Sequence, residues 1–146
     1  MDWKKVAIDD LRHYRCLKDA LKNFNDNITN LVEDSISLKS GLSNPEPIKG
    51  GGTKQEDKMI NMIVKKERLK LNQKAIQALM KMIERGLNNL NENELSILKY
   101  FYMEEGRKIS IDCLCNKMGY EKSRIYQIRN DGLKKFTMSM YGIIDL

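Results

Sequence analysis

The residues of this chain best suited to recognition chemistry lie between positions 122 and 136, where polar side chains recur at helical spacing. At 100° per residue, hydroxyl, amide and cationic groups share one side of a helix and apolar groups share the other. Polar groups of these types hydrogen-bond base edges or phosphates in the major groove of DNA, whereas a merely solvated helix more often carries paired Glu and Lys. The predicted DNA contacts are Lys122, Ser123, Arg124, Tyr126, Gln127, Asn130 and Lys134, and the residues predicted to face inward are Ile125, Ile128, Gly132 and Phe136, with Leu133 at their edge.

A second, shorter helix is predicted just before this one. Ser110 is a favoured N-cap, and Gly119 follows the last apolar position, where a left-handed residue would end the helix. The next helix is predicted from Lys122 to Phe136, preceded by Glu121, which is a poor cap. Two short helices around a glycine turn indicate a helix-turn-helix DNA reader. The apolar positions of the first helix are Ile111, Leu114, Cys115 and Met118, and Cys113 is expected nearer the surface.

Positive charge is concentrated in the same segment. From Arg107 to Lys135 there are eight cations and three anions, a net charge of +5, whereas the whole chain has a net charge of +6. Nearly all the excess positive charge therefore lies where phosphates would be bound.

These residues carry a resemblance to a known family. The segment SRIYQIRNDGLKKF resembles the second half of sigma-70 region 4, and the preceding SIDCLCNKMGYEKS is similar to the first half, so that the likeness covers Asn91 to Phe136. The whole layout, a helical half followed by a region-4-like end, resembles the small phage regulators of late transcription of the RinA and ArpU kind. The resemblance implies that Lys122, Ser123 and Gln127 occupy base-contacting positions.

Two long helices are predicted before this region, because apolar residues alternate spacings of three and four as in a heptad seam. The loop from Ser43 to Lys54 contains two prolines and three consecutive glycines, so both helices must end there. Two helices joined by a short loop pack antiparallel, which predicts an elongated hairpin. The seams are Tyr14, Leu17, Leu21, Phe24, Ile28, Leu31, Ser35, Leu38 and Leu42, and then Met59, Met62, Lys66, Leu69, Gln73, Ile76, Met80, Ile83, Leu87 and Leu90.

Several features leave alternatives open. Lys66 and Gln73 in the seam either determine its register or extend their polar ends to water. The apolar tail from Thr137 either caps the C-terminal region or docks on a partner. The apolar stripe of the hairpin is wider than one seam can bury, so that either the C-terminal region or a second copy of the chain must cover it. The residues that widen it are Val32, Ile36, Ile60, Ile63 and Val64.

The predicted fold is all-α, in two parts. Residues 1–90 form the helical hairpin with its loop at 43–54, and residues 91–146 form the sigma region 4-like helix-turn-helix domain with a short apolar tail. A support helix is expected over Asn91–Met103, with an Asn cap and with the three aromatic residues 100–102 in the core and at its rim.

Composition and residue inventory exclude several classes of function. No apolar run approaches the length of a membrane span, and the N-terminal residues are too charged for a signal peptide, which predicts a cytoplasmic protein of a bacterial host cell. The three cysteines lack disulfide or zinc spacing and His13 is the single histidine, so we expect no metal, no cofactor and no catalytic residue. The GGGTK at Gly50 lacks the order of a phosphate loop. We therefore do not expect an enzyme.

The function predicted from the sequence is a sequence-specific, DNA-binding transcription regulator, phage-encoded and acting on late genes. The expected partners are double-stranded DNA, a second copy of the chain in a homodimer, and host RNA polymerase. Two alternatives remain: a small terminase-like DNA-recognition subunit for phage packaging, which also joins a helix-turn-helix to oligomerising helices, and a coiled-coil adaptor. The adaptor would leave the concentrated charge unexplained.

Overall fold

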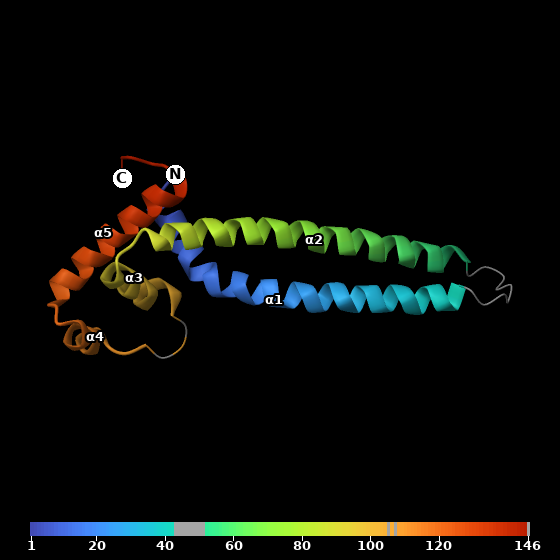
Figure 1. Cartoon of the computed structure of the whole chain (residues 1–146), viewed down its shortest axis with the longest axis horizontal. Coiled ribbons are helices and arrows are strands. Elements are labelled where there is room, and N and C mark those ends of the chain that lie inside the picture. The colour runs from blue at the N-terminus through green and yellow to red at the C-terminus, as the bar shows by residue number, and fades with distance from the viewer. Residues whose placement is uncertain (43–51, 105, 107, 146) are drawn as a thin grey trace. The chain divides into compact units, whose positions relative to one another are not determined.

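The structure is a computed structural model that describes residues 1–42, 52–104, 106 and 108–145. Over these residues it is helical and contains no strand, which confirms the all-α prediction. None of the described helices has both the length and the apolar character needed to cross a membrane. The helices are α1 (Trp3–Leu42), α2 (Gly52–Asn88), α3 (Glu92–Leu98), a π-helical turn η1 (Lys99–Met103), α4 (Ile111–Met118) and α5 (Lys122–Tyr141) (Figure 1).

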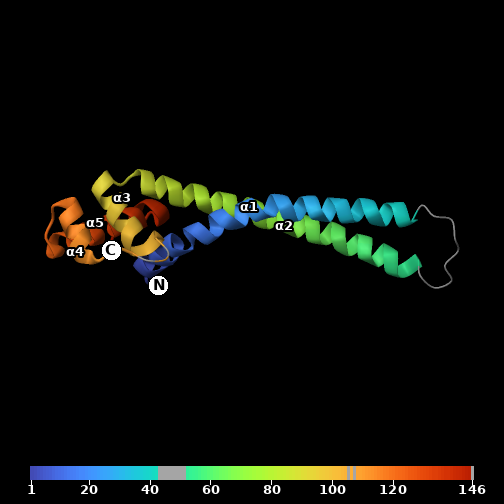
Figure 2. The same cartoon turned by 90° about the horizontal axis from the view of Figure 1, so that it is seen from below.

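Over residues 18–78, helices α1 and α2 run antiparallel and lie side by side, as both views show (Figures 1 and 2). Every predicted seam position whose side chain is described is buried or half-buried, and this confirms both seams. The Gln73 amide donates to Asn25 Oδ1 across the helix pair at 3.3 Å, a contact that favours the register role for this residue. Helix α1 ends at Leu42 as predicted, and α2 begins at Gly52, slightly earlier than predicted; the rest of the predicted loop, residues 43–51, lies outside the described part of the chain.

The described residues form two compact units whose boundaries fall within the two long helices. One unit is Met1–Leu17 with Leu79–Leu146, and the other is Lys18–Ala78. The sequence placed the division at residue 90. The structure differs because the first turns of α1 and the last turns of α2 share a hydrophobic core with α3 and α5. We call the first unit the head and the second the hairpin arm.

The larger core of the head surrounds the C-terminal half of α5. Phe136 is fully buried, and a Cβ added at Gly86 would lie 2.9 Å from its ring, so that α2 and α5 approach closely only because position 86 is a glycine. Helix α5 continues five residues beyond its predicted end, and Met140 is buried. The first part of the tail therefore belongs to the core. The buried members of this cluster are Ala7, Leu11, Ile83, Leu87, Leu98, Leu133, Phe136 and Met140.

Polar and aromatic contacts attach the N-terminal turns of α1 to the rest of the head. The Tyr141 hydroxyl donates to the Asp10 carboxylate, and the Tyr141 ring lies 5.0 Å from the Trp3 ring. The Tyr14 hydroxyl donates to Glu84 Oε1 at 3.3 Å. Burial raises the pKa of both phenols, and the neighbouring carboxylates raise it further.

These contacts predict a loss of stability in alkali. The folded chain holds the Tyr14 and Tyr141 protons more tightly than the unfolded chain. Their contribution to the free energy of unfolding is therefore complete at neutral pH and is lost as the pH rises above about 10. Denaturant titrations from about pH 8 to 11 should show a falling free energy of unfolding, and Tyr141→Phe should flatten this fall while lowering stability at pH 8. The same pH slope in the wild type and the variant would contradict this account.

Candidate nucleic-acid interface

Helices α4 and α5 are joined by a tight turn whose geometry follows from its residues. The Ser110 hydroxyl caps α4 by accepting from the Cys113 N–H at 3.2 Å. Gly119 has a φ of +72° and donates to the Cys115 carbonyl at 2.9 Å, which ends the helix as predicted. The Glu121 side chain makes no capping hydrogen bond, and α5 begins directly after it. The sequence thus predicted both ends of the turn correctly.

A second, smaller core holds the N-terminal half of α5 against α3 and α4. Cys115 packs at the edge of this core and Cys113 is exposed, in agreement with the helical spacing. The five residues of α5 that were predicted to face inward are all buried, so the orientation of the helix is confirmed. The buried members of the smaller core are Ile97, Leu114, Ile125 and Ile128.

The polar side of α5 is open to solvent. The structure leaves six of the seven predicted contact residues exposed and brings them together on one helix, whereas Tyr126 is half-buried. Its ring centroid lies 5.9 Å from that of Phe101. Tyr126 therefore contributes to the wall of the head as well as to its surface. The exposed members are Lys122, Ser123, Arg124, Gln127, Asn130 and Lys134, and we call them the polar side of α5.

Two arginines on the same helix hold the two amide side chains of this surface. Arg124 Nη1 donates to Gln127 Oε1 at 2.9 Å. Arg129 Nε and Nη2 donate to Asn130 Oδ1 at 3.3 and 3.2 Å. Both amide carbonyl oxygens thus accept hydrogen bonds from guanidinium groups of the same helix.

Aromatic rings position one of these arginines. The Arg129 guanidinium lies 5.0 Å from the Phe101 ring centroid and 4.9 Å from that of Tyr126, within the range of cation–π attraction. The Tyr100 hydroxyl donates to the Ile109 carbonyl at 2.7 Å, and its ring packs against the smaller core. The aromatic run from Tyr100 to Tyr102 is thus core and rim, as the sequence predicted.

The head itself uses part of the concentrated positive charge. Lys108 donates to the Phe101 carbonyl at 3.1 Å, Arg129 stacks on aromatic rings, and Lys135 is paired with a carboxylate. Position 107 lies outside the described residues. Lys135 is thus paired with an opposite charge, whereas Lys108 and Arg129 keep their charge and are held in place by a carbonyl and by aromatic rings. The remaining exposed cations of the segment are Lys117, Lys122, Arg124 and Lys134.

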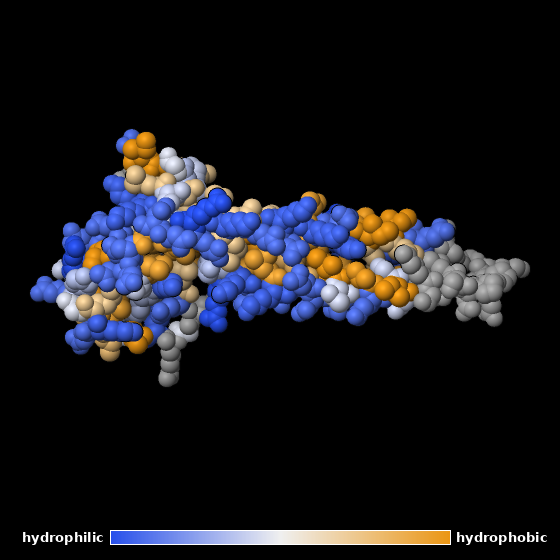
Figure 3. All heavy atoms as spheres, viewed as in Figure 1, coloured by the Kyte–Doolittle hydropathy of each residue, from blue (hydrophilic) through white to orange (hydrophobic). Residues whose placement is uncertain are grey.

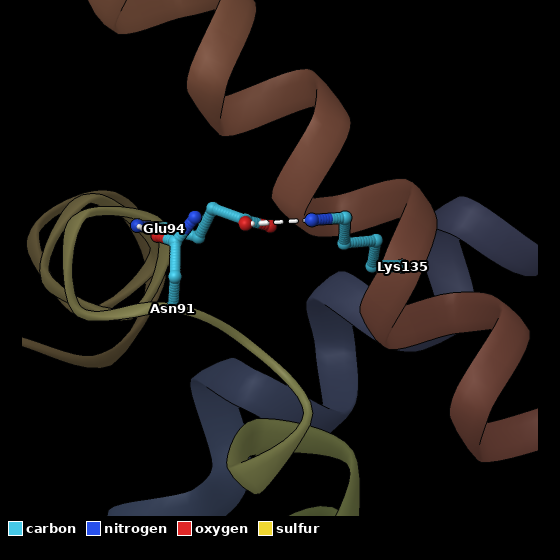
Figure 4. Close-up of polar contacts among 3 residues, drawn as sticks. All are labelled: Asn91, Glu94 and Lys135. Atoms are coloured by element: carbon cyan, nitrogen blue, oxygen red, sulfur yellow. Dashed lines mark hydrogen bonds and ion pairs between the residues drawn. The ribbon is translucent and has the colours of Figure 1, made fainter.

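A buried carboxylate that sequence reasoning missed joins α3 to α5 (Figure 4). The Glu94 side chain is 5% exposed, its Oε1 accepts from Lys135 Nζ at 2.8 Å, and its Oε2 is buried without a partner. A Cβ at Gly132 would lie 3.3 Å from Glu94 Cβ, so glycine allows the two helices to meet there. The signal that could have found this site is the Asn91-x-x-Glu94 spacing of a helix start, where the Glu94 N–H donates to Asn91 Oδ1 at 2.8 Å.

A groove of about 480 Å³ opens beside this pair, between α3 and α5. On one wall the Asn93 amide donates to the Tyr120 hydroxyl at 2.9 Å. Cations of α5 line the other wall, and two of them, Arg124 and Lys134, also belong to the polar side of α5. The carboxylates of Glu94 and Asp131 also line this groove, so that it carries charges of both signs. Among the described residues, no three His, Cys, Asp or Glu side chains gather as a metal site requires.

The head contains a helix-turn-helix formed by α4 and α5, and the hairpin arm consists of antiparallel parts of α1 and α2. The chain belongs to the family described as protein of unknown function (DUF1492), which it matches over residues 37–137. The match extends from the end of α1 into the C-terminal half of α5, and so includes all of α4 and residues 122–137 of α5. No curated protein and no solved structure matches the chain.

The Glu94–Lys135 pair leads to a stability prediction. Lys135→Met should lower the free energy of unfolding by about 1 to 3 kcal/mol, because it leaves the Glu94 carboxylate buried with no partner. We expect the lower half of this range, since the lysine is more than half exposed and water screens the pair. Denaturant unfolding at pH 7 measures the effect.

The neighbouring residue provides the control. Lys134 is exposed, so that Lys134→Met removes the same charge and should change stability by less than about 0.5 kcal/mol. Adding Glu94→Gln to Lys135→Met should recover part of the loss, because a neutral amide is less costly to bury than a carboxylate. Equal effects of the two lysine variants would show that the pair does not stabilise the head.

Proposed function

We propose that this chain is a sequence-specific, double-stranded DNA-binding regulator of transcription that reads the major groove with α5. The observation that carries the proposal is the polar side of α5, a row of hydroxyl, amide and cationic groups that stays exposed along a helix entered from a tight turn. A helix presented in this way fits the width of the major groove and offers hydrogen-bonding groups to base edges.

Charge supports the proposal. Helix α5 carries five cations and a single anion, Asp131. Besides the paired Lys135, three of these cations are exposed along α5, and one more is exposed on α4: Lys122, Arg124, Lys134 and Lys117. Phosphates on either side of a groove would therefore lie near cations of the reading helix or of its neighbour α4. Binding of this kind needs no catalytic residue, and the proposed role is non-enzymatic.

The finer role rests on the resemblance stated for the sequence. The likeness to sigma-70 region 4, and to late-transcription regulators of the RinA and ArpU kind, supports a phage-encoded regulator of late genes that acts in the cytoplasm of a bacterial host. The first half of the chain forms a helical hairpin. In this proposal the chain therefore assists transcription, and host RNA polymerase is a candidate partner.

We also propose that the hairpin arm pairs with a second copy of the chain. One side of the arm has a groove lined by Val32, Met59, Met62 and Ile63, whereas the groove on the other side is lined by polar groups that include Asn27 and Asp34. Figure 3 shows apolar atoms gathered along both helices of the arm. Among the described residues of the arm, the large hydrophobic side chains that remain exposed are Val32 (37%), Ile36 (59%), Ile60 (58%), Ile63 (56%), Val64 (46%) and Leu71 (64%).

Charge complementarity indicates that the partner of this surface is another arm. Between Asn23 and Leu38, α1 has three anions and no cation, whereas between Lys58 and Lys74, α2 has six cations and one anion. A two-fold axis that places α1 of one copy over α2 of the other joins the same apolar side of both and surrounds it with opposite charges. The product would be a four-helix bundle.

DNA binding gives the first test. Affinity for a selected duplex should fall steeply with salt, because each neutralised phosphate releases counterions. Gln127→Ala should lower discrimination by about 1 to 3 kcal/mol at one base pair, and Lys134→Ala should weaken binding to all sequences alike. Fluorescence anisotropy over a salt series, with selected and scrambled duplexes, measures both effects. An affinity that does not change between low and moderate salt would rule out phosphate binding.

Self-association gives the second test. Ile60→Gln with Ile63→Gln should leave the helical content intact, since neither residue is in the seam, and should weaken dimerisation at least about tenfold. Light scattering after gel filtration should show twice the chain mass for the wild type. Lys65→Gln, on the polar side of the arm, is the control and should remain dimeric. A folded wild-type monomer at high concentration would overturn the pairing and favour RNA polymerase as the occupant of this surface.

A further inference from the structure

One of the two amides on the polar side of α5 is held by a chain of contacts that reaches the smaller core. Arg129 Nε and Nη2 both donate to Asn130 Oδ1, at 3.3 and 3.2 Å. The Arg129 guanidinium in turn lies 5.0 Å from the Phe101 ring centroid and 4.9 Å from that of Tyr126. Asn130 is exposed, whereas Arg129 and the two rings are half-buried. The contacts therefore connect an exposed polar side chain to the interior of the head.

The fold fixes the inner end of this chain of contacts. The Phe101 ring packs against the smaller core and meets the Tyr100 ring edge-on, with their centroids 5.0 Å apart. The Phe101 carbonyl accepts from Lys108 Nζ at 3.1 Å. The two rings that support the guanidinium come from different elements, η1 and α5, and their centroids are 5.9 Å apart. Arg129 therefore loses rotamer freedom when the chain folds, before any partner binds.

The orientation of Asn130 decides which end of its amide meets a base. The amide torsion of a free Asn side chain is broad and roughly two-fold, so the carbonyl oxygen and the NH2 group exchange places readily. Such a side chain can match one pattern of base donors and acceptors and also the reversed pattern. In this chain, reversal would turn the NH2 group toward Arg129, which has donors only, and would lose both hydrogen bonds from the guanidinium. Asn130 is therefore held with its carbonyl oxygen toward Arg129.

Gln127, the other amide on this surface, is held less firmly. Its Oε1 accepts a single N–H from Arg124, at 2.9 Å. Arg124 is exposed, and side-chain pairs three residues apart on a helix surface are weak. Glutamine also has one more rotatable bond than asparagine. We therefore expect Gln127 to adapt to its partner, whereas Asn130 keeps one orientation.

We propose that Arg129 and Phe101 are positioning residues for base recognition, which hold Asn130 in one orientation and so sharpen the selection of one base pair. This role deepens the function proposed above and rests on it, because it requires α5 to enter the major groove. Neither residue was among the DNA contacts predicted from the sequence. A recognition side chain whose rotamer is fixed by such supporting contacts discriminates better than a free one.

The ordering of Asn130 can be measured on the full chain without DNA. Side-chain 15N relaxation of the NH2 groups should give Asn130 a higher order parameter than Gln127. Arg129→Lys keeps the positive charge but lacks the guanidinium fork, so it should lower the Asn130 value toward that of Gln127. Arg124→Lys is the matched control, since it makes the same change on the same helix and should leave Asn130 ordered.

Binding-site selection from a randomised duplex library tests the consequence for DNA. The position that loses its preference in Asn130→Ala is the one read by Asn130. At this position Arg129→Lys should reduce the preference by about threefold or more, because the side chain must then be ordered on binding. The salt dependence of binding should stay the same, since the charge is kept. Arg124→Lys should leave the preference at this position unchanged.

Phe101 variants test the inner end of the chain of contacts. Phe101→Leu removes the ring and should reduce the same preference, whereas Phe101→Tyr keeps the ring face and should retain the wild-type preference. Phe101 also packs against the smaller core, so far-UV circular dichroism must first show that Phe101→Leu is folded. If it does not fold, Arg129→Lys still provides the test.

The outcomes separate the positioning role from the function on which it rests. An Asn130 order parameter no higher than that of Gln127, an Asn130→Ala preference unchanged at every position, or an Arg129→Lys preference equal to that of the wild type would each overturn the positioning role and leave DNA binding intact. A library in which no sequence is enriched, together with no salt-dependent binding to any duplex, would overturn the proposed function and the positioning role with it.

Discussion

The structure depends on the burial of one side of α5 along its whole length. Its first half packs through Ile125 into the smaller core, and its second half packs through Phe136 into the larger core, where it meets the first turns of α1 and the last turns of α2. The two cores bury the same side of α5. Because a helix has a period of 3.6 residues, the opposite side of α5 then faces solvent. The exposure of Gln127 and its polar neighbours is therefore a consequence of packing.

The aromatic turn η1 connects the two cores of the head to the exposed polar side of α5. Its wider π-helical turn brings Tyr100 and Phe101 to the smaller core and Tyr102 and Met103 to the larger one. Phe101 then supports Arg129, which in turn holds the Asn130 carbonyl. The same cation that contributes to the net charge also holds an exposed amide side chain in place. Charge counted from sequence alone cannot distinguish these two uses.

In the proposed dimer, one sequence pattern in the hairpin arm would specify two levels of association. The seam residues are buried within the chain, whereas Val32, Ile60 and Ile63 remain exposed beside them. Burial of apolar surface is favourable wherever a partner is available, and in the arm the opposite charges of α1 and α2 make another arm a suitable partner. In this proposal the arm and the head have separate tasks, pairing and reading, and paired heads would read paired half-sites.

The sequence by itself determined the features that depend on neighbours along the chain. Periodicity predicted the helices, both seams and the inward side of α5, because helix geometry repeats every few residues. Capping residues such as Ser110 and Gly119 predicted where α4 begins and ends. Only the tertiary structure decided that Glu94 meets Lys135, 41 residues away, and that Tyr141 meets Asp10, 131 residues away. Such contacts leave no periodic signal, since they arise when separate helices fill one core. For this reason the extended α5 and the shared core of the head could not be predicted.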